Sequence, residues 1–339
     1  MKNYIVHNEW SIIEEGFKPE VNLVSESLMS LGNGFMGLRG NFEETYTGET
    51  LQGTYVGGVY YPDKTRVGWW KNGYPEYFAK VLNNVNWIGL HIKINDQILD
   101  LNKCEVSEYK RELNMQVGVL TRTFKAKLKN GIEVTVKAER FCSMYNGELG
   151  ALNYAITTSE KAKIEVVSFL DFDIENQDSN YDEKFWDEAD RGKNGNDFGI
   201  VGKTKKTEFL VSAACHFVLQ KCEQVITKPL HEVSADKQIG QAYVVNVEAN
   251  EQVSISKICA ILSSLNHNKE GILKTSFAVL EKAAAKGFDT IKAEHEKTWL
   301  DKWEECDIKI DGDISAQQGI RFNIFQLYQT YTGEDERLN

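Results

Sequence analysis

The chain has 339 residues, of which 42% are hydrophobic and 11% aromatic, and it carries a formal net charge of −11 with a pI near 5.2. This length can bury a sizeable core and exceeds the usual size of one domain. The acidic charge, without clusters of lysine and arginine, argues against a nucleic-acid partner. Without a membrane-spanning apolar run or a secretory signal, we expect no membrane association and a cytoplasmic location.

Glycine and aromatic residues alternate between residues 31 and 77 at a density that no ordinary strand or helix needs. Glycine allows backbone conformations closed to other residues, and the interleaved side chains could build a rigid polar and stacking surface. The alternative is the loop-rich rim of a β-sandwich, held by buried aromatic residues. As candidates for a substrate-facing rim or an interface we select Asn33, Arg39, Arg66, Trp69, Trp70, Glu76 and Tyr77.

Each candidate also has a structural explanation. The rings of Trp69 and Trp70 could stack on pyranose rings, and Arg66 could donate to hydroxyl groups or phosphate. Adjacent tryptophans, however, often divide between core and interface, so we favour the interface over direct sugar contact. For Arg39, between Gly37 and Gly40, we favour a buried salt bridge that orders the loop.

Most of the chain up to about residue 262 alternates with period two and predicts β-strands. The clearest pair, 117–128 and 132–142, flanks Asn130-Gly131, the strongest short-range hairpin signal. Further predicted strands are 87–94, 98–101, 149–158, 164–172, 208–217, 241–247 and 253–262. Many antiparallel strands separated by turns predict two packed sheets, a mainly β fold with a large antiparallel β-sandwich.

The acidic loop 171–183 superficially resembles a calcium loop but departs from the template. Asn176 stands where the sharp turn needs glycine, and Asp182 where a bidentate Glu is expected. We interpret the segment as a solvated or partner-facing loop. Phe185 and Trp186, which follow it, could dock the loop on its own sandwich, on a further domain or on a second subunit.

Helical patterns replace the strands after residue 262. Residues 269–286 predict a helix with Gly287 as its C-cap, and Asp289 could cap a second helix that runs to about residue 305. Ser315 is a plausible cap for a third helix, after a short strand-like segment at 307–310. The apolar side of this third helix is predicted to carry Ile320, Ile324, Leu327, Tyr328 and Tyr331.

The chain offers no sign of a cofactor or a metal site. The six histidines lack the paired spacing of a metal site, no phosphate-binding loop is visible, and the six scattered cysteines read as reduced, buried core residues. We interpret the carboxylates that sit among glycine or aromatic residues as structural acceptors rather than proton donors: Glu43, Glu44, Glu76, Glu334 and Asp335.

Three runs in the order LGNGFMGLRGNFEE (31–44), LQGTY (51–55) and DKTRVGWWKNGYPEY (63–77) resemble the N-terminal region of glycoside hydrolase family 65. The last two runs are most similar to its maltose-cleaving members, and the similarity extends over residues 8–339. The chain would cover less than half of the family's length. This resemblance implies a β-sandwich (super-sandwich) at 1–265, linker helices at 266–312 and the first helix of an incomplete (α/α)6 barrel at 313–339.

The resemblance also implies an activity, namely inverting phosphorolysis of a disaccharide, with maltose and inorganic phosphate converted to β-glucose 1-phosphate and glucose. It places the general acid in the barrel beyond residue 339, so we expect no catalytic residue here and an inactive N-terminal part that supports the barrel rim and a homodimer. Kojibiose, nigerose and trehalose remain alternative substrates. A free-standing carbohydrate-binding sandwich and a purely scaffolding or dimerisation unit are the alternative functions.

Overall fold

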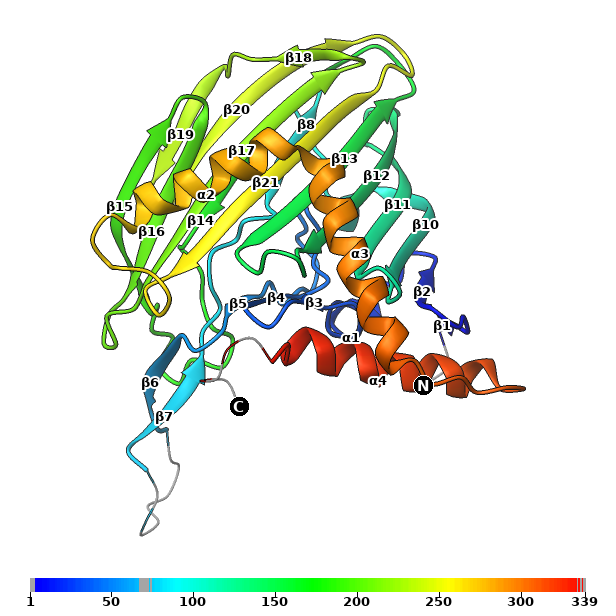
Figure 1. Cartoon of the computed structure of the whole chain (residues 1–339). Helices are drawn as coiled ribbons and strands as arrows, with labels where there is room; N and C mark the ends of the chain where they lie inside the picture. Colours follow the sequence, from blue (N-terminus) through cyan, green and yellow to red (C-terminus); the bar gives the residue numbers. More distant parts are fainter. Residues whose placement is uncertain (1–3, 67–72, 74, 334, 336, 338–339) are drawn as a thin grey trace.

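The computed structural model describes residues 4–66, 73, 75–333, 335 and 337. Two antiparallel sheets, one large and one small, face each other, and helices from the C-terminal part of the chain cover the large sheet and its lower edge (Figure 1). The predicted mainly β class, with antiparallel sheets followed by a few helices, is therefore confirmed.

The large sheet contains 11 strands within the described residues, and β18 (Gln224–Ile226) joins it by pairing with β17. The other ten follow in the spatial order β1 (Ile5–Val6), β2 (Ser11–Glu15), β10 (Glu105–Asn114), β11 (Val119–Lys127), β12 (Glu133–Cys142), β13 (Leu149–Thr158), β21 (Val253–Ser263), β17 (Leu210–Lys221), β16 (Asp197–Thr204) and β15 (Trp186–Asn194).

The smaller sheet packs on the inner face of the large one. Its strand order is β19 (His231–Ala235), β20 (Gln238–Val247), β14 (Ala162–Asp171), β8 (Leu90–Ile94) and β9 (Gln97–Ile98). Alternate residues of both sheets point into one shared core, where the rings of Phe217 and Tyr243 lie 5.2 Å apart across the two sheets. This alternation is what period-two patterning requires, because successive strand side chains point to opposite faces.

Two short ribbons complete the β structure. One contains β3 (Leu31–Gly32), β4 (Met36–Leu38) and β5 (Thr54–Val56) and lies beneath the sandwich, whereas the hairpin of β6 (Tyr60–Lys64) and β7 (Tyr77–Val81) projects away from the body (Figure 1). The remaining short elements are η1 (Pro19–Val21), α1 (Asn22–Leu28) and η2 (Leu101–Lys103). The glycine-rich stretch thus supplies the first ribbon, the strand β6 and the first residue of β7.

The three C-terminal helices occupy different surfaces. The helix α2 (Ile272–Lys286) lies across the outer face of the large sheet, α3 (Phe288–Cys306) descends along the sheet, and α4 (Ile314–Thr330) runs beneath it (Figure 1). Apolar residues of α2 and α3 form a second core with outward-facing residues of β13, β17 and β21. Because this core seals a face that would otherwise be exposed, α2 is part of the sandwich packing rather than a free linker.

Several local predictions need correction. The Asn-Gly signal predicts a two-residue turn with both residues at positive φ. In the turn between β11 and β12 only Gly131 has positive φ, +90°, and its N–H donates to the carbonyl of Leu128. Asp313, not Ser315, caps α4 by accepting N–H bonds from Ser315 and Ala316 at 2.9 and 3.0 Å. The N-cap of α3 is Gly287, so Asp289 lies inside the first turn. The segment 307–310 forms no strand.

The cysteine prediction is right in part. All six cysteines are free, and Cys142, Cys215 and Cys259 lie in the core between the sheets as expected. Cys222 is exposed, since it occupies a tight turn at φ +52° between β17 and β18. Cys104 and Cys306 are only partly buried.

Candidate functional site

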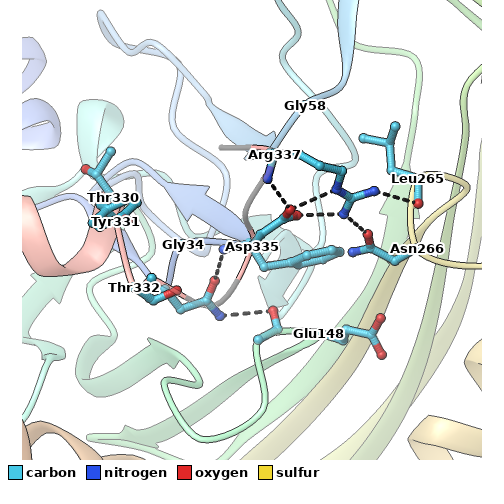
Figure 2. A pocket seen from close by; sticks show the side chains of 15 residues that line it. Gly34, Gly58, Glu148, Leu265, Asn266, Thr330, Tyr331, Thr332, Asp335 and Arg337 are labelled. Atoms are coloured by element: carbon cyan, nitrogen blue, oxygen red, sulfur yellow. Dashed lines mark hydrogen bonds and ion pairs between the residues drawn. The ribbon is translucent and has the colours of Figure 1, made fainter. Parts of the chain in front are cut away.

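The best-formed concavity lies where the glycine-rich stretch meets the end of α4, with a volume of about 760 Å³ (Figure 2). It is open to solvent on one side and combines backbone groups of five glycines with carboxylate, amide, guanidinium and aromatic side chains. Its lining residues come from five separate segments: Asn33, Gly34, Phe35, Gly57, Gly58, Gly147, Glu148, Leu265, Asn266, Thr330, Tyr331, Thr332, Gly333, Asp335 and Arg337.

Asn33 holds one wall of this cavity in place. Its side-chain amide donates to the carbonyls of Ser143 and Gly147 at 2.9 and 3.0 Å, and its Oδ1 accepts from the N–H groups of Phe35 and Met36 at 3.1 and 2.8 Å. These four bonds use both amide protons and both acceptor positions of the side chain. Asn33 therefore ties the turn between β3 and β4 to the loop between β12 and β13.

Two further polar contacts lie at the cavity. Glu148 is hydrogen-bonded to Nε2 of His267, and the guanidinium of Arg337 is paired with Asp335 at 2.6 Å. Arg337 also donates to the carbonyl of Leu265 at 2.9 Å and to the side-chain oxygen of Asn266, so it spans from the chain end to the loop after β21 (Figure 2). Hydrogen bonds from Arg337 lower the pKa of Asp335 to about 2.

Arg39 lies in the neighbouring loop and does not line the cavity. Its side chain donates to the carbonyls of Leu51 and Leu23 at 2.9 and 3.1 Å, and its guanidinium lies 4.0 Å from the buried carboxylate of Glu26. Its own carbonyl accepts a bond from Arg140 at 3.2 Å. These contacts connect the glycine-rich stretch to α1 and to the large sheet.

The remaining described candidates belong to the projecting hairpin. Arg66 donates to the carbonyl of Asn180 at 3.3 Å, the carbonyl of Glu76 accepts the N–H of Thr65 at 2.8 Å, and Tyr77 is exposed on β7. None of these residues lines the cavity. Trp69 and Trp70 lie outside the described residues.

The acidic loop that follows β14 braces this hairpin. The N–H of Asn180 donates to the buried carboxylate of Asp63 at 2.9 Å, and the ring of Phe185 stacks on Tyr61 with centroids 4.1 Å apart. Asn176 accepts the N–H of Asn83 and donates to the carbonyl of Val81, both at 2.9 Å. Of the docking positions considered for this loop, the structure places it on its own sandwich.

A buried ionic cluster ties residues 39–44 of the glycine-rich stretch to the large sheet. Arg122 binds Glu43 and Glu44, and Arg140 binds Glu43, with all four side chains almost fully buried. Burial opposes ionisation of Glu43, but the charges of Arg140 and Arg122 outweigh it and hold the pKa of Glu43 below its ordinary value. Both carboxylates are therefore structural acceptors, as their sequence context indicated.

Sequence reasoning missed the arginine partners of these carboxylates. Arg122 and Arg140 alternate with apolar residues on the inward faces of β11 and β12, where period-two patterning predicts a core position. An arginine at such a position is a usable signal, because a charge is buried only when it is paired. The sequence does not say which carboxylate is the partner.

The described residues contain no group of three or more His, Cys, Asp and Glu side chains that could hold a metal ion. In the same part of the chain no helix is long and apolar enough to cross a membrane. The cavity thus offers hydrogen-bonding backbone, carboxylates and aromatic surface. These groups suit a neutral polyhydroxylated ligand, because hydroxyl groups both donate and accept.

Fold and cavity together define a β-sandwich domain with appended helices and a polar concavity at their junction. Residues 12–302 match the description "Glycosyl hydrolase family 65, N-terminal domain", and the chain belongs to this family. A solved structure, a putative kojibiose phosphorylase from human microbiome, superposes with a TM-score of 0.89 at 28% identity, covering 98% of this chain and 43% of the other. The expected family resemblance is confirmed.

Among curated relatives, the maltose phosphorylase of Bacillus subtilis (strain 168) is 38% identical over 334 residues, which cover 98% of this chain and 43% of the relative. The alpha,alpha-trehalose phosphorylase of Thermoanaerobacter brockii is 29% identical over 356 residues, with 98% and 44% covered. The chain therefore spans less than half the length of the curated relatives it matches.

Proposed function

We propose that this chain acts as the N-terminal domain of an inverting disaccharide phosphorylase that converts maltose and phosphate to β-glucose 1-phosphate and glucose. The observation that carries this proposal is the 38% identity to the maltose phosphorylase of Bacillus subtilis over nearly the whole chain. The trehalose, kojibiose and nigerose phosphorylases among its relatives are 22–29% identical. These three substrates are the alternatives.

In an inverting phosphorolysis, an acid protonates the glycosidic oxygen while phosphate attacks the anomeric carbon from the opposite face. Among the described residues, the cavity holds no free acid for this step. Asp335 is kept ionised by Arg337, and Glu148 is engaged by His267. We therefore assign the proton donor to a helical domain outside this chain and give the chain the task of supporting and shaping the entrance.

The surface of α4 supports this division. Leu327 on α4 is 68% exposed, and Ile314 at the start of the helix and Tyr331 at its C-cap are exposed as well. An apolar helix face gains stability when other helices cover it. We assign α4 to the start of the catalytic barrel, and we keep the boundaries 1–265 for the sandwich, 266–312 for the connecting helices and 313–339 for the beginning of the barrel.

The glycine-rich stretch and the projecting hairpin have separate tasks in this proposal. Residues 33–44 shape the entrance from the body of the sandwich. The hairpin of β6 and β7 is a two-stranded ribbon, which alone is marginally stable in water, and it exposes Tyr77 and Val81 on β7. We assign this hairpin to the contact between the two subunits of a homodimer.

A chimera tests the assignment of activity. The corresponding N-terminal part of the Bacillus subtilis maltose phosphorylase is replaced by this chain, and release of glucose 1-phosphate is measured with maltose, trehalose and kojibiose as substrates. A second chimera places this chain before the remaining part of the trehalose phosphorylase of Thermoanaerobacter brockii, and each chimera is compared with its parent enzyme. We expect the maltose phosphorylase chimera to keep the larger share of its parent's activity. The isolated chain should turn over none of these disaccharides.

Two outcomes would contradict the proposal. A trehalose phosphorylase chimera that keeps the larger share of its parent's activity would move the substrate assignment to trehalose. Turnover by the isolated chain would place a proton donor inside it. If the isolated chain binds maltose by calorimetry while the folded chimera stays inactive, the carbohydrate-binding module becomes the better interpretation.

A further inference from the structure

The C-terminal end of α4 lacks a local cap. Many helices end with a glycine in the left-handed conformation, which satisfies the last carbonyl groups. Here the C-cap residue Tyr331 is extended at φ −128° and ψ 106°. Local bonds satisfy two of the last carbonyls, since Leu327 O accepts from Tyr331 N at 2.8 Å and Gln326 O accepts from the Thr330 hydroxyl at 2.8 Å.

The carbonyl of Gln329, two residues after Leu327, is bonded from the N-terminal part of the chain. Gly34 donates its N–H to the carbonyl of Gln329 at 2.8 Å, and the side chain of Gln329 donates to the carbonyl of Ser30 at 3.4 Å. The turn between β3 and β4 therefore supplies in three dimensions the cap that the sequence of α4 does not provide. Asn33 makes this turn rigid through its four hydrogen bonds.

Glycine is required at both contact points. A Cβ atom on Gly32 would lie 2.9 Å from the backbone oxygen of Gln329. On Gly34 it would lie 2.7 Å from Cγ2 and 2.8 Å from Oγ1 of Thr332, and Gly34 also has φ +81°. A side chain on Gly32 would have to move the end of α4, and one on Gly34 would have to displace the side chain of Thr332, because Cβ atoms do not approach other atoms this closely.

We propose that Gly32 and Gly34 form a seat for the C-terminal end of α4 and that this seat sets the direction in which the chain leaves the helix along the cavity. The segment that leaves contains Tyr331, Thr332 and Gly333, which line the cavity. The two glycines are thus positioning residues for the carbohydrate site. This role in positioning the site rests on the proposed function, whereas the seat itself does not.

The cavity wall formed by this segment has two anchors. The first is the seat at Gly34, and the second is Arg337, which donates to Leu265 O and Asn266 (Figure 2). In the same view Thr332 and Gly34 lie on one side of the cavity, with Leu265 and Asn266 on the other. Loss of the seat removes the attachment at Gly34, so residues 331–333 should open more readily while the sandwich stays folded.

Four variants separate the close contact from the backbone strain. Gly34→Ala introduces both, while Gly131→Ala is the matched control, because Gly131 has φ +90° and a Cβ added there would meet nothing within 4 Å. Thr332→Ala removes the two atoms closest to the new methyl group and leaves the Cβ of residue 332 at 3.3 Å. The double variant Gly34→Ala/Thr332→Ala therefore keeps the strain but relieves the contact.

Hydrogen exchange of the isolated chain reports on the seat directly. We expect Gly34→Ala to accelerate amide exchange at residue 34, whose N–H donates to Gln329 O, and at Tyr331, whose N–H donates to Leu327 O, by at least about tenfold, which corresponds to about 1.4 kcal/mol of local opening. Thr332→Ala in the same chain should restore most of the protection, and Gly131→Ala should leave these amides unchanged. Equal exchange in Gly34→Ala and Gly131→Ala would overturn the seat.

Kinetics of the chimera then test positioning. In a chimera that phosphorolyses maltose, Gly34→Ala should lower kcat/KM by roughly 10- to 100-fold, because a wall displaced by about 1 Å costs that much, and the double variant should recover. The Tm of the chimera should change no more than in Gly131→Ala. An accelerated exchange with unchanged kcat/KM would refute positioning but keep the seat, and a folded but inactive chimera would refute the proposed function alone.

Discussion

At the scale of single residues, His295 shows how a helix residue can hold two loops together. Its ring is buried on α3, accepts the N–H of Met144 on Nδ1 at 3.0 Å and faces the carbonyl of Gly118 with Nε2 at 3.1 Å. The ring also stacks on Phe141 with centroids 4.5 Å apart. This pattern fits a neutral imidazole that carries its proton on Nε2.

Burial of this ring predicts a loss of stability in mild acid. Because desolvation penalises the charged ring, the pKa of His295 falls to about 4, compared with about 6.5 in an unfolded chain. Between these values the unfolded state binds the proton and the native state does not, so stability decreases as pH falls from about 6.5 to 4. From pH 7 to pH 5 the free energy of unfolding should drop by about 2 kcal/mol through His295.

The measurement is urea unfolding at several pH values, followed by tryptophan fluorescence. His295→Gln is the control, because glutamine can accept and donate at similar positions but does not titrate in this range. The difference between the two profiles of unfolding free energy against pH reports His295 alone, because carboxylates that titrate in the same pH range contribute to both proteins. Parallel pH profiles for the two proteins would show that His295 is protonated in the native state or contributes nothing.

At the scale of elements, α4 buries mostly polar residues against the sandwich. Apart from Phe325, its apolar side chains are half-buried or exposed. The buried residues are Gln317, Gln318, Arg321, Phe325 and Gln329. Arg321 is the clearest of them, since it forms two bonds with Asp307 at 2.8 and 2.9 Å and its guanidinium lies 3.6 Å from the ring centroid of Trp10.

Two substitutions on α4 should therefore differ widely in their effect on stability. Arg321→Ala should destabilise the chain by roughly 2–4 kcal/mol, because it removes a largely buried ion pair and a cation–π contact. Leu327→Lys should change stability by less than about 0.5 kcal/mol and reduce self-association, because Leu327 is exposed. Chemical unfolding and light scattering measure the two effects. A larger loss of stability for Leu327→Lys would mean that the outer face of α4 packs against the chain itself.

At the scale of the whole molecule, the helices after residue 265 are not an independent appendage. Trp299, Trp303 and Phe325 join the core between the sheets, while α2 seals the outer face of the large sheet. The sandwich and the helices therefore share their apolar cores. We expect the chain to unfold as one cooperative unit rather than sandwich first and helices later.

Shortening the chain tests this expectation. A chain of residues 1–265 loses seven large buried apolar side chains of α2 and α3, worth on the order of 10 kcal/mol together, namely Ile272, Leu273, Leu280, Phe288, Ile291, Trp299 and Trp303. We expect it to aggregate and to bind a hydrophobic dye, whereas a chain of residues 1–312 should remain folded with lower stability. A monomeric 1–265 chain with a cooperative unfolding transition would show that the sandwich is self-sufficient.

Much of this architecture could be predicted from local patterns. Period-two alternation located β11, β12, β13, β14 and β21, and the helical period located α2, α3 and α4 to within a few residues. Both signals arise because successive side chains of one element meet one core, which is a property of neighbouring residues. The glycine-rich stretch was recognisable for the same reason, because glycine occurs at the very positions whose backbone conformation requires it.

The sequence by itself determined the class of fold, the family, the glycine positions with unusual backbone conformation and the charged residues at core positions. The tertiary structure alone decided what those positions meet: Gly34 meets Gln329, Arg122 meets Glu43, and the polar face of α4 meets the sandwich. The physical reason is separation along the chain. Periodicity and propensity act over a few residues, whereas a hydrogen-bond partner almost 300 residues away is chosen only when the packed sheets bring the two segments together.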